Sequence, residues 1–378
     1  MQLYLDNAST TSVDEDVKKL FLSLLDQYYA STSSLHQQGV QALHLETEAK
    51  NQIAQLLKVS PNEIYFNSGA TEGNNYAIKG VAFQYQNRGK TIITTKIEHP
   101  SVLESVKQLE RDFHFKAVYL DVDENGVISL QDLQKHLNQD VILVSIMYVN
   151  HEIGSIMPIH EIHEMLKKYP KIIFHSDVTQ AIGKCDIDFS DLDLATMSAH
   201  KIHGMKGCGF LYKRDRVQLY PIINGHPAQN TMRAGTSNWL SNVTIALALK
   251  KAYQHLKEDA ILIRKTQQRL ISLLNEIPQV QVNMNAQFSI PHIINFSLSN
   301  YNPEVIIRAL SQKGIYVSSK SACSVAQKDQ VSSTLYAMHK DIQICISSIR
   351  ISLERPLSEE EIQYFIQSLK EIIAIIRK

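Results

Sequence analysis

Short apolar runs alternate with amphipathic stretches over about residues 60 to 215 of this chain of 378 residues. The runs have the length of buried strands, and the stretches between them have helical spacing. Such alternation predicts an α/β fold with a mostly parallel sheet covered by helices on both faces. In such sheets ligands bind beyond the carboxyl ends of the strands, where we expect the functional site. The predicted strands are 63–67, 91–95, 117–120, 142–149, 172–175, 192–197 and 209–212.

The remainder of the chain predicts a second, smaller α/β domain. A long amphipathic stretch over about 241–277 indicates helix leading out of the first domain. Strands are then expected around 294–298, 315–318 and 348–352, and a C-terminal helix from Ser358. A chain of this length is too long for one ordinary core and fits two packed domains.

Charge and cysteine content exclude several classes of protein. The 38 basic and 38 acidic residues balance, which argues against a general binder of nucleic acid or membrane surfaces. No apolar run is long enough to span a bilayer, and the first residues lack the features of a signal peptide. Four cysteines are too few and too scattered for a disulfide framework or a metal site. We therefore expect a cytoplasmic protein with reduced thiols and no bound metal.

Polar residues follow two successive strands. Lys201, in Ser198-Ala199-His200-Lys201, comes after the run 192–197, and Asp177-Val178-Thr179-Gln180 ends the strand before it. A lysine, a carboxylate and an amide in this arrangement fit a site for pyridoxal 5'-phosphate (PLP). Lys201 would hold the cofactor, Asp177 would keep its ring nitrogen protonated, and Gln180 could donate to its phenolic oxygen. The alternative for Asp177 is an ordinary capping residue.

Three further motifs could complete such a site. The amides of Ala70 and Thr71 begin a helix after Gly69, and a helix N-terminus attracts phosphate. The alternative is an ordinary helix cap with Glu72 in the first turn. His99 ends the strand 91–95 and could stack on a flat ring, or it could be a structural histidine. Ser198 and His200, beside the lysine, could bind the phosphate.

Three residues indicate a substrate and a second reactive group. Asn150 follows the strand 142–149 and could orient a substrate carboxylate. Arg350 lies within the apolar strand 348–352, where it needs either such a carboxylate or a structural ion pair. Cys323 lies in a small, polar segment beside Ser and Lys residues, and nearby positive charge favours a thiolate. The alternative is an incidental surface thiol.

In this order the motifs resemble those of the NifS/IscS-like cysteine desulfurases, which are class V aminotransferases of PLP fold type I. The resemblance covers nearly the whole chain. It is carried by Tyr4-Leu5-Asp6-Asn7-Ala8-Ser9-Thr10-Thr11, His36-Gln37-Gln38-Gly39, Ser68-Gly69-Ala70-Thr71-Glu72, Glu98-His99, Val149-Asn150-His151-Glu152-Ile153-Gly154, Asp177-Val178-Thr179-Gln180, Ser198-Ala199-His200-Lys201, Met232-Arg233-Ala234-Gly235-Thr236, Ser321-Ala322-Cys323 and Ser348-Ile349-Arg350-Ile351-Ser352.

The resemblance implies a fold and a role for each of these positions. The large domain, with a mostly parallel seven-stranded sheet, would bind PLP and span 13–255. Residues 1–12 and 256–378 would form the small domain that carries the catalytic cysteine. Lys201, Cys323 and His99 would be catalytic, and Asn150 and Arg350 would bind the substrate L-cysteine. The residues that would bind PLP are Ala70, Thr71, His99, Asp177, Gln180, Ser198, His200, Lys201 and, from the partner of a homodimer, Thr236.

The implied reaction converts L-cysteine to L-alanine and leaves a persulfide on Cys323. Its sulfur would pass to an acceptor protein, either a tRNA-thiolation enzyme or an iron–sulfur scaffold. The short C-terminal segment after the last predicted helix favours a tRNA-thiolation enzyme as the acceptor. Four positions depart from the family pattern: Met205, Asn230, Lys320 and Glu354. The alternatives are a selenocysteine lyase or another class V PLP enzyme, and a homologue that binds PLP with low activity.

Overall fold

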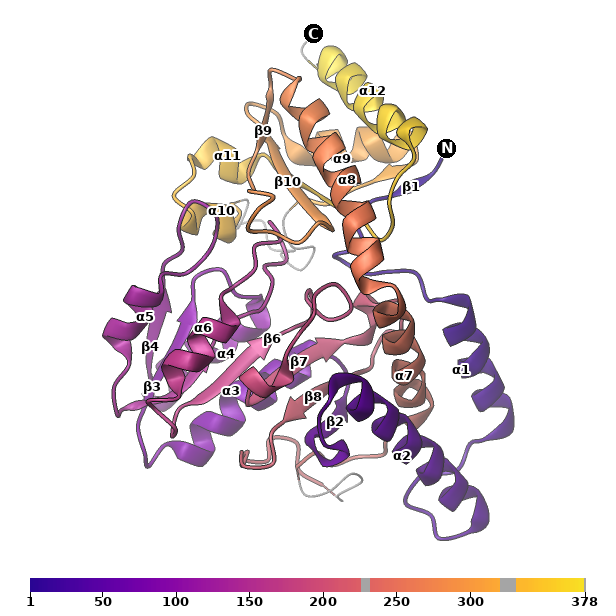
Figure 1. Ribbon diagram of the computed structural model, residues 1–378, viewed down its shortest axis with the longest axis vertical. Helices are drawn as coiled ribbons and strands as arrows, with labels where there is room; N and C mark the ends of the chain where they lie inside the picture. The colour runs from indigo at the N-terminus through magenta and orange to yellow at the C-terminus, as the bar shows by residue number, and fades with distance from the viewer. Residues whose placement is uncertain (226–231, 320–330, 377–378) are drawn as a thin grey trace.

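The computed structural model describes residues 1–225, 232–319 and 331–376, and its largest feature is a seven-stranded sheet (Figure 1). The strands lie in the order β2-β8-β7-β6-β5-β3-β4. β8 runs antiparallel to both of its neighbours, and the other pairs are parallel, so the predicted mostly parallel sheet is confirmed. The strands are β2 (Ile64–Asn67), β3 (Thr91–Thr95), β4 (Lys116–Leu120), β5 (Val141–Ser145), β6 (Ile173–Asp177), β7 (Leu194–Ser198) and β8 (Gly209–Lys213).

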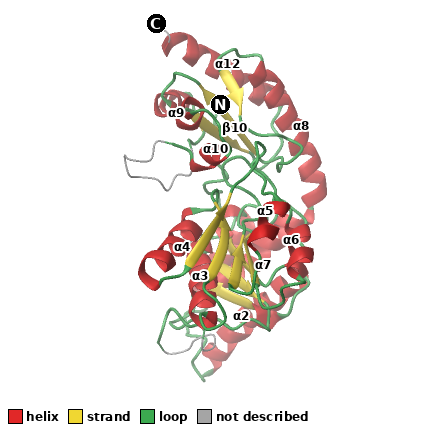
Figure 2. Ribbon diagram, turned by 90° about the vertical axis from the view of Figure 1, so that its left-hand side faces the viewer, coloured by secondary structure: helices red, strands yellow, loops and turns green. Residues whose placement is uncertain are grey.

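Helices cover both faces of this sheet (Figure 2). On one face lie α3 (Ala70–Tyr85) and α4 (Pro100–Phe113), and on the other lie α5 (Leu130–His136), α6 (Ile159–Leu166) and α7 (Trp239–Gln254). Successive side chains of a strand point to opposite faces, and Ile92 and Ile93 of β3 accordingly pack into different cores. Burial on both faces explains why the strands are continuous apolar runs.

Two N-terminal helices, α1 (Glu15–Gln27) and α2 (Gln37–Leu57), pack against α7. The side chain of Asp14 caps α1 by accepting hydrogen bonds from the amides of Asp16 and Val17. The connection between the two helices is fixed to α7 by Trp239, whose Nε1 donates to the carbonyl of Ala30 at 3.1 Å.

The helix α8 (Leu256–Asn275) leads to a smaller part of the molecule, where both termini lie (Figure 1). Its antiparallel sheet has the order β12-β10-β9, and β1 pairs in parallel with β11 beside it. The N-terminal strand is therefore joined to the C-terminal part of the chain. The elements are β1 (Leu3–Tyr4), β9 (Val280–Val282), β10 (Ile293–Leu298), α9 (Pro303–Gln312), β11 (Ile315–Tyr316), α10 (Ser333–Ala337), α11 (Ile342–Ile346), β12 (Ser348–Ser352) and α12 (Glu359–Ile376).

Two predicted elements differ from those observed. The stretch 241–277 forms two helices, because the backbone of His255 (φ −126°, ψ 23°) is not helical and separates α7 from α8. The strand predicted over 142–149 ends at Ser145, after which the chain turns and Val149 forms only an isolated bridge to Ile156. Asn150 therefore does not stand at the end of a sheet strand. The domain boundaries at 12/13 and 255/256 stay a prediction.

Within residues 1–225, 232–319 and 331–376, two features are absent. No helix in these parts of the chain is long and apolar enough to cross a membrane. Nor do the described His, Cys, Asp and Glu side chains form a group of three that could hold a metal ion.

Candidate active site

A cavity of about 190 Å³ lies beyond the carboxyl ends of β6 and β7, where the strand-end rule places a ligand. It brings together nine of the predicted site residues from segments far apart in the sequence. The lining residues are Ala8, Ser9, Ala70, Thr71, His99, Met147, Val149, His151, Asp177, Thr179, Gln180, Ser198, His200, Lys201 and Arg350.

Lys201 stands in the short helix η3 (Ala199–Lys201), which directly follows β7. Its Nζ donates hydrogen bonds to two backbone carbonyls of the N-terminal segment, at 2.5 Å to Ala8 and 2.7 Å to Ser9. These two contacts with the folded N-terminal segment orient the amine in the cavity lining.

Asp177 ends β6 and is 7% exposed. Its carboxylate accepts hydrogen bonds from Asn74 Nδ2 at 2.8 Å and from the amide of Thr179 at 3.0 Å. Both are neutral donors, which leaves the negative charge available to a cation in the cavity. Gln180 lies one turn on, and its Nε2 donates to the carbonyl of Ala8 at 2.9 Å.

His99 caps the helix α4, and this contact determines which ring nitrogen carries the proton. Its Nδ1 accepts a hydrogen bond from the amide of Ser101 at 3.2 Å, so the neutral ring carries its proton on Nε2. Burial, with a further contribution from the positive charge of Lys201, lowers the pKa of His99. A neutral, apolar-faced ring at this position suits stacking on a flat ligand.

A hollow of about 310 Å³ adjoins the cavity at the N-terminus of α3 and shares Ala70, Thr71, Ser198 and His200 with it. Gly69 precedes the helix with φ +134°, and a Cβ there would lie 3.0 Å from Ser198 Oγ. The amide of Ala70 donates to the same Oγ at 2.7 Å. Together the two spaces form an elongated site.

His200 and Lys206 give this hollow its electrostatic character. The Nδ1 of His200 is 3.1 Å from Thr10 Oγ1. Burial, together with the charges of Lys201 and Lys206, lowers the pKa of His200 to about 4. The ring is therefore neutral near pH 7, and Lys206 is a cation in the lining of the hollow. A helix N-terminus beside a lysine favours an anion.

Arg350 reaches the cavity from β12 in the small part of the molecule and is 2% exposed. Its Nη1 donates to the carbonyl of His151 at 2.8 Å, and its Nη2 donates to Asp6 Oδ1 at 3.0 Å and Ser9 Oγ at 2.7 Å. The structural ion pair that the sequence left open is thus present. Its Nε has no hydrogen-bond partner among the described residues, which leaves capacity for a ligand.

Three predicted residues do not reach the cavity in the described structure. Asn150 is fully buried, and its side chain is hydrogen-bonded to the carbonyl of Ile97 and the amides of Glu152 and Ile153. It shapes the turn that follows β5. Thr236 is exposed and outside the cavity lining. Cys323 lies outside the described residues.

Sequence reasoning gave no role to several residues that line the site. Ala8, Ser9 and His151 belong to motifs that carried the family resemblance, and that membership was the available signal. Met147 and Lys206 carried no comparable signal, because each reaches the site through a turn whose path the sequence does not specify.

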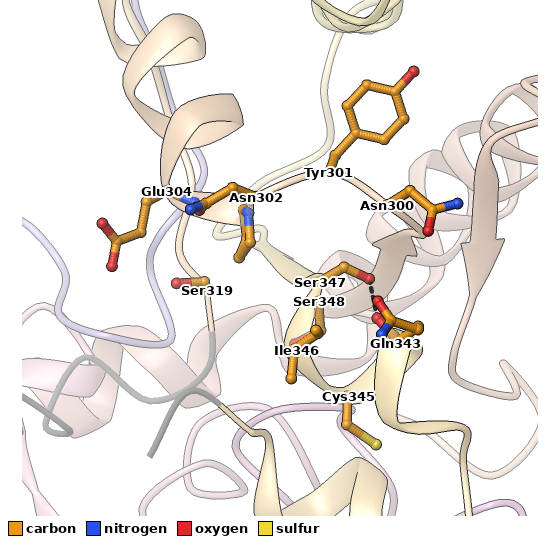
Figure 3. A pocket seen from close by; sticks show the side chains of 11 residues that line it. Asn300, Tyr301, Asn302, Glu304, Ser319, Gln343, Cys345, Ile346, Ser347 and Ser348 are labelled. Carbon is orange, nitrogen blue, oxygen red and sulfur yellow. Dashed lines mark hydrogen bonds between the residues drawn. The ribbon is translucent and has the colours of Figure 1, made fainter. Parts of the chain in front are cut away.

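A larger cavity, of about 320 Å³, lies on the small part of the molecule between α9 and α11 (Figure 3). Its described lining is mostly neutral and polar, with Asn300, Asn302, Gln343 and Ser347, and includes the carboxylate of Glu304. No lysine, arginine or histidine is present among the described residues that line it. The grouping of reactive side chains therefore favours the smaller cavity as the active site.

The chain matches the family model described as aminotransferase class-V over residues 3–365. It is 40% identical to the cysteine desulfurase IscS of Pectobacterium carotovorum subsp. carotovorum, with 100% of this chain and 94% of that protein covered. The chain therefore belongs to the class-V aminotransferase family and, within it, to the group of NifS/IscS-like cysteine desulfurases.

Solved structures agree with this assignment. A structure titled NifS-like protein superposes with a TM-score of 0.93 at 35% identity, covering 99% of this chain and all of that one. A second, titled SspA in complex with cysteine, gives a TM-score of 0.81 at 30% identity over 94% of this chain and 100% of the other. The predicted fold, a large mostly parallel sheet domain with a smaller α/β part, is confirmed.

Proposed function

We propose that this protein is a PLP-dependent cysteine desulfurase that converts L-cysteine to L-alanine and transfers the sulfur to Cys323. The observation that carries the proposal is the convergence of Lys201, Asp177, His99 and Arg350 on one cavity. The 40% identity to an IscS cysteine desulfurase over the full chain supports the same activity.

The elongated site fits PLP, which would supply a protonated ring that withdraws electrons from the substrate's α-carbon. Lys201 would hold it, Asp177 would face the ring nitrogen, and His99 would stack on the ring. The anionic end matches the hollow at the start of α3, where Thr71, Ser198 and His200 would hold the phosphate. Since the amide of Ala70 already donates to Ser198 Oγ, its contact with phosphate requires that the serine shift or share it.

The cavity residues divide the work on L-cysteine. Arg350 would bind the substrate carboxylate through its uncommitted Nε edge. Asn150, predicted to bind the same carboxylate, would act through the turn that it holds. The amine of Lys201 would take the proton from the α-carbon and return it to the product. SspA in complex with cysteine supports an amino-acid ligand for this fold.

Sulfur transfer to Cys323 conserves both atoms and electrons. The Cys323 thiolate attacks the substrate sulfur, and the bond between that sulfur and the β-carbon breaks. The electron pair of the broken bond, with a proton, completes the methyl group of alanine. The enzyme keeps one additional sulfur atom as a persulfide, and no external oxidant is required.

A homodimer is also proposed, and an exposed apolar surface supports it. Large apolar side chains gather on α1, α2 and their connection, namely Leu22, Leu25, Tyr29, Leu35, Val40 and Leu43. Exposed groups of this kind mark interaction surfaces. Ser237 bonds to Glu46 of α2, so the exposed Thr236 beside it lies next to this surface. Docking of a second copy here would bring Thr236 toward the partner's phosphate site.

The sulfur acceptor is proposed to be a cytoplasmic protein, either a tRNA-thiolation enzyme or an iron–sulfur scaffold. Persulfide transfer from the enzyme, labelled with ³⁵S-cysteine, to purified candidates of both kinds would identify it. Transfer to neither kind would contradict this part of the proposal.

The activity is tested by alanine formation from L-cysteine in the presence of a reducing thiol. The wild-type protein should form alanine and sulfide, and Cys323→Ser should lose sulfide release while its visible PLP absorbance is unchanged. Cys345→Ser, a change at a buried thiol outside the lining of the active-site cavity, is the matched control and should retain activity. Sulfide release that survives Cys323→Ser would exclude this mechanism and favour a lyase of the selenocysteine type.

A further inference from the structure

His151 is a buried residue of the active-site cavity for which the proposed function gives no role. It is 7% exposed and lies in the turn after β5, next to Asn150. No hydrogen-bond partner is found for its Nδ1 in the described parts of the chain. Its Nε2 lies 3.9 Å from Glu152 Oε1, beyond hydrogen-bonding distance. Burying a polar imidazole without hydrogen bonds to its nitrogens costs free energy, which indicates that the ring itself has a function.

The ring of His151 packs against the ring of His99. The two centroids are 5.6 Å apart and the planes meet at 70°, which is an edge-to-face arrangement. His99 is also held by Ser101, whose amide donates to its Nδ1. One contact fixes an edge of the His99 ring and the other limits its tilt. The orientation of the ring that would stack on PLP thus depends on His151.

The charges around His151 keep its ring neutral. Burial, together with the positive charges of Arg350 and Lys201, lowers the pKa of His151 well below the ordinary value. The carboxylate of Glu152 lies 3.9 Å from its Nε2. A neutral ring exerts no strong electrostatic field on His99. The side chain of His151 therefore acts on His99 through packing.

The backbone of the same residue holds Arg350. The carbonyl oxygen of His151 accepts the Nη1 hydrogen bond at 2.8 Å. A substitution at 151 changes the ring and leaves this carbonyl in place. The effect of the side chain on His99 can therefore be separated from the effect of the backbone on Arg350.

We propose that His151 is a positioning residue whose ring sets the orientation of His99 above the cofactor. The inference rests on the proposed function for its kinetic consequence and on the structure alone for its effect on His99. It predicts that a planar ring of similar size can replace the imidazole and that a non-planar apolar side chain of similar size cannot.

The test compares His151→Phe with His151→Leu, which differ in the planar ring and share apolar character and bulk. Thermal unfolding of both variants establishes that they fold. In the cofactor-free protein, the His99 ring signals in ¹³C-histidine NMR, assigned through His99→Gln, should stay at their wild-type positions in the Phe variant and move in the Leu variant. PLP affinity, titrated by absorbance, should fall in the Leu variant only.

In the loaded enzyme, kcat should fall about tenfold in His151→Leu and stay within about threefold in His151→Phe, since a misplaced group costs rate more than binding. The KM for L-cysteine should be similar in both, because the carbonyl that holds Arg350 is retained. Wild-type behaviour of both variants would overturn the proposal, and so would an equal loss in both, which would assign the role to the nitrogens. Absence of alanine formation by the wild-type protein would contradict the proposed function and leave the NMR and PLP comparison as the test of this inference.

Discussion

Lys201 and Asp177 reach the cavity from the ends of neighbouring parallel strands, whereas Arg350 reaches it from the middle of β12 in the small sheet. Asp177 is held by neutral donors, and Lys201 is held by two backbone carbonyls of the N-terminal segment. Arg350 is held by an ion pair to Asp6 and by Ser9, both in the N-terminal segment. The large sheet thus places the reactive groups, and the small sheet adds an anion-binding group that a third segment must orient.

The N-terminal segment connects the two sides. The backbone carbonyls of Ala8 and Ser9 accept from Lys201, and the side chains of Asp6 and Ser9 accept from Arg350. Since β1 pairs with β11, this segment also belongs to the small sheet. A change on the large-sheet side is expected to affect the chemical step, and a change at Arg350 is expected to affect substrate binding.

The largest expected effect is that of Lys201→Ala. Removing the amine abolishes both attachment of PLP and proton transfer at the α-carbon, and kcat/KM should fall by about 10³-fold or more. Alanine formation and the visible spectrum of the loaded protein are the measurements. Lys206→Ala, which removes a lysine of the adjoining hollow, is the control and should keep the spectrum of a lysine-bound cofactor. Activity of Lys201→Ala within tenfold of the wild type would refute the assignment.

Arg350→Lys is expected to have the next largest effect. Lysine keeps the charge and loses the planar fork that binds a carboxylate, so kcat/KM should fall by about 10- to 100-fold. Most of the loss should appear as a higher KM for L-cysteine, with the PLP spectrum unchanged. A loss confined to kcat would show that Arg350 acts on the chemical step and would remove the distinction between the two sides.

Glu98→Gln should have the smallest effect on activity and a measurable effect on stability. Glu98 is fully buried, and desolvation raises its pKa from 4.5 to about 8. Its Oε1 accepts from Thr95 and from the amide of Met147, while its Oε2 has no partner among the described residues. Unlike Asp6, it forms no ion pair with an arginine in the described parts of the chain. Glutamine preserves the accepting oxygen, so kcat/KM should stay within about threefold.

The sign of the pH dependence follows from the raised pKa. Between the unfolded value of 4.5 and the folded value of about 8, the native protein binds this proton more tightly than the unfolded chain. The contribution of Glu98 to stability is therefore present below pH 4.5 and is lost as the pH rises toward 8. The free energy of unfolding, measured with denaturant at about pH 5 and about pH 8, should decline less in Glu98→Gln than in the wild-type protein, by on the order of a few kcal/mol. An equal decline in both proteins would contradict the buried, protonated state.

The difference between the large sheet and the segments that meet it also separates the residues that the sequence could predict from those that it could not. Strand ends follow from continuous apolar runs, and six of the seven large-sheet strands lie within about two residues of their predicted bounds. For this reason Lys201, Asp177, Gln180 and His99 were expected together, and they line one cavity. Asn150 does not line it, because the apolar residues after Ser145 continue the pattern while the backbone leaves the sheet.

Contacts between distant segments were beyond the reach of local pattern. The strand of Arg350 was predicted, but its partners Asp6 and Ser9 lie more than 340 residues away in the sequence. The edge-to-face contact of His151 and His99 depends in the same way on the turn after β5. Resemblance to a family supplied the motifs in which these residues stand, and the fold supplied their contacts.

In the proposed mechanism the cavity around Lys201 prepares L-cysteine, and Cys323 accepts the sulfur. Mass spectrometry of peptides from the PLP-loaded protein, after one turnover with L-cysteine and without reducing thiol, tests this directly. One additional sulfur atom is expected on the peptide that contains Cys323 in the wild-type protein, and none in Lys201→Ala. An unmodified Cys323 peptide in a wild-type sample that has formed alanine would contradict it.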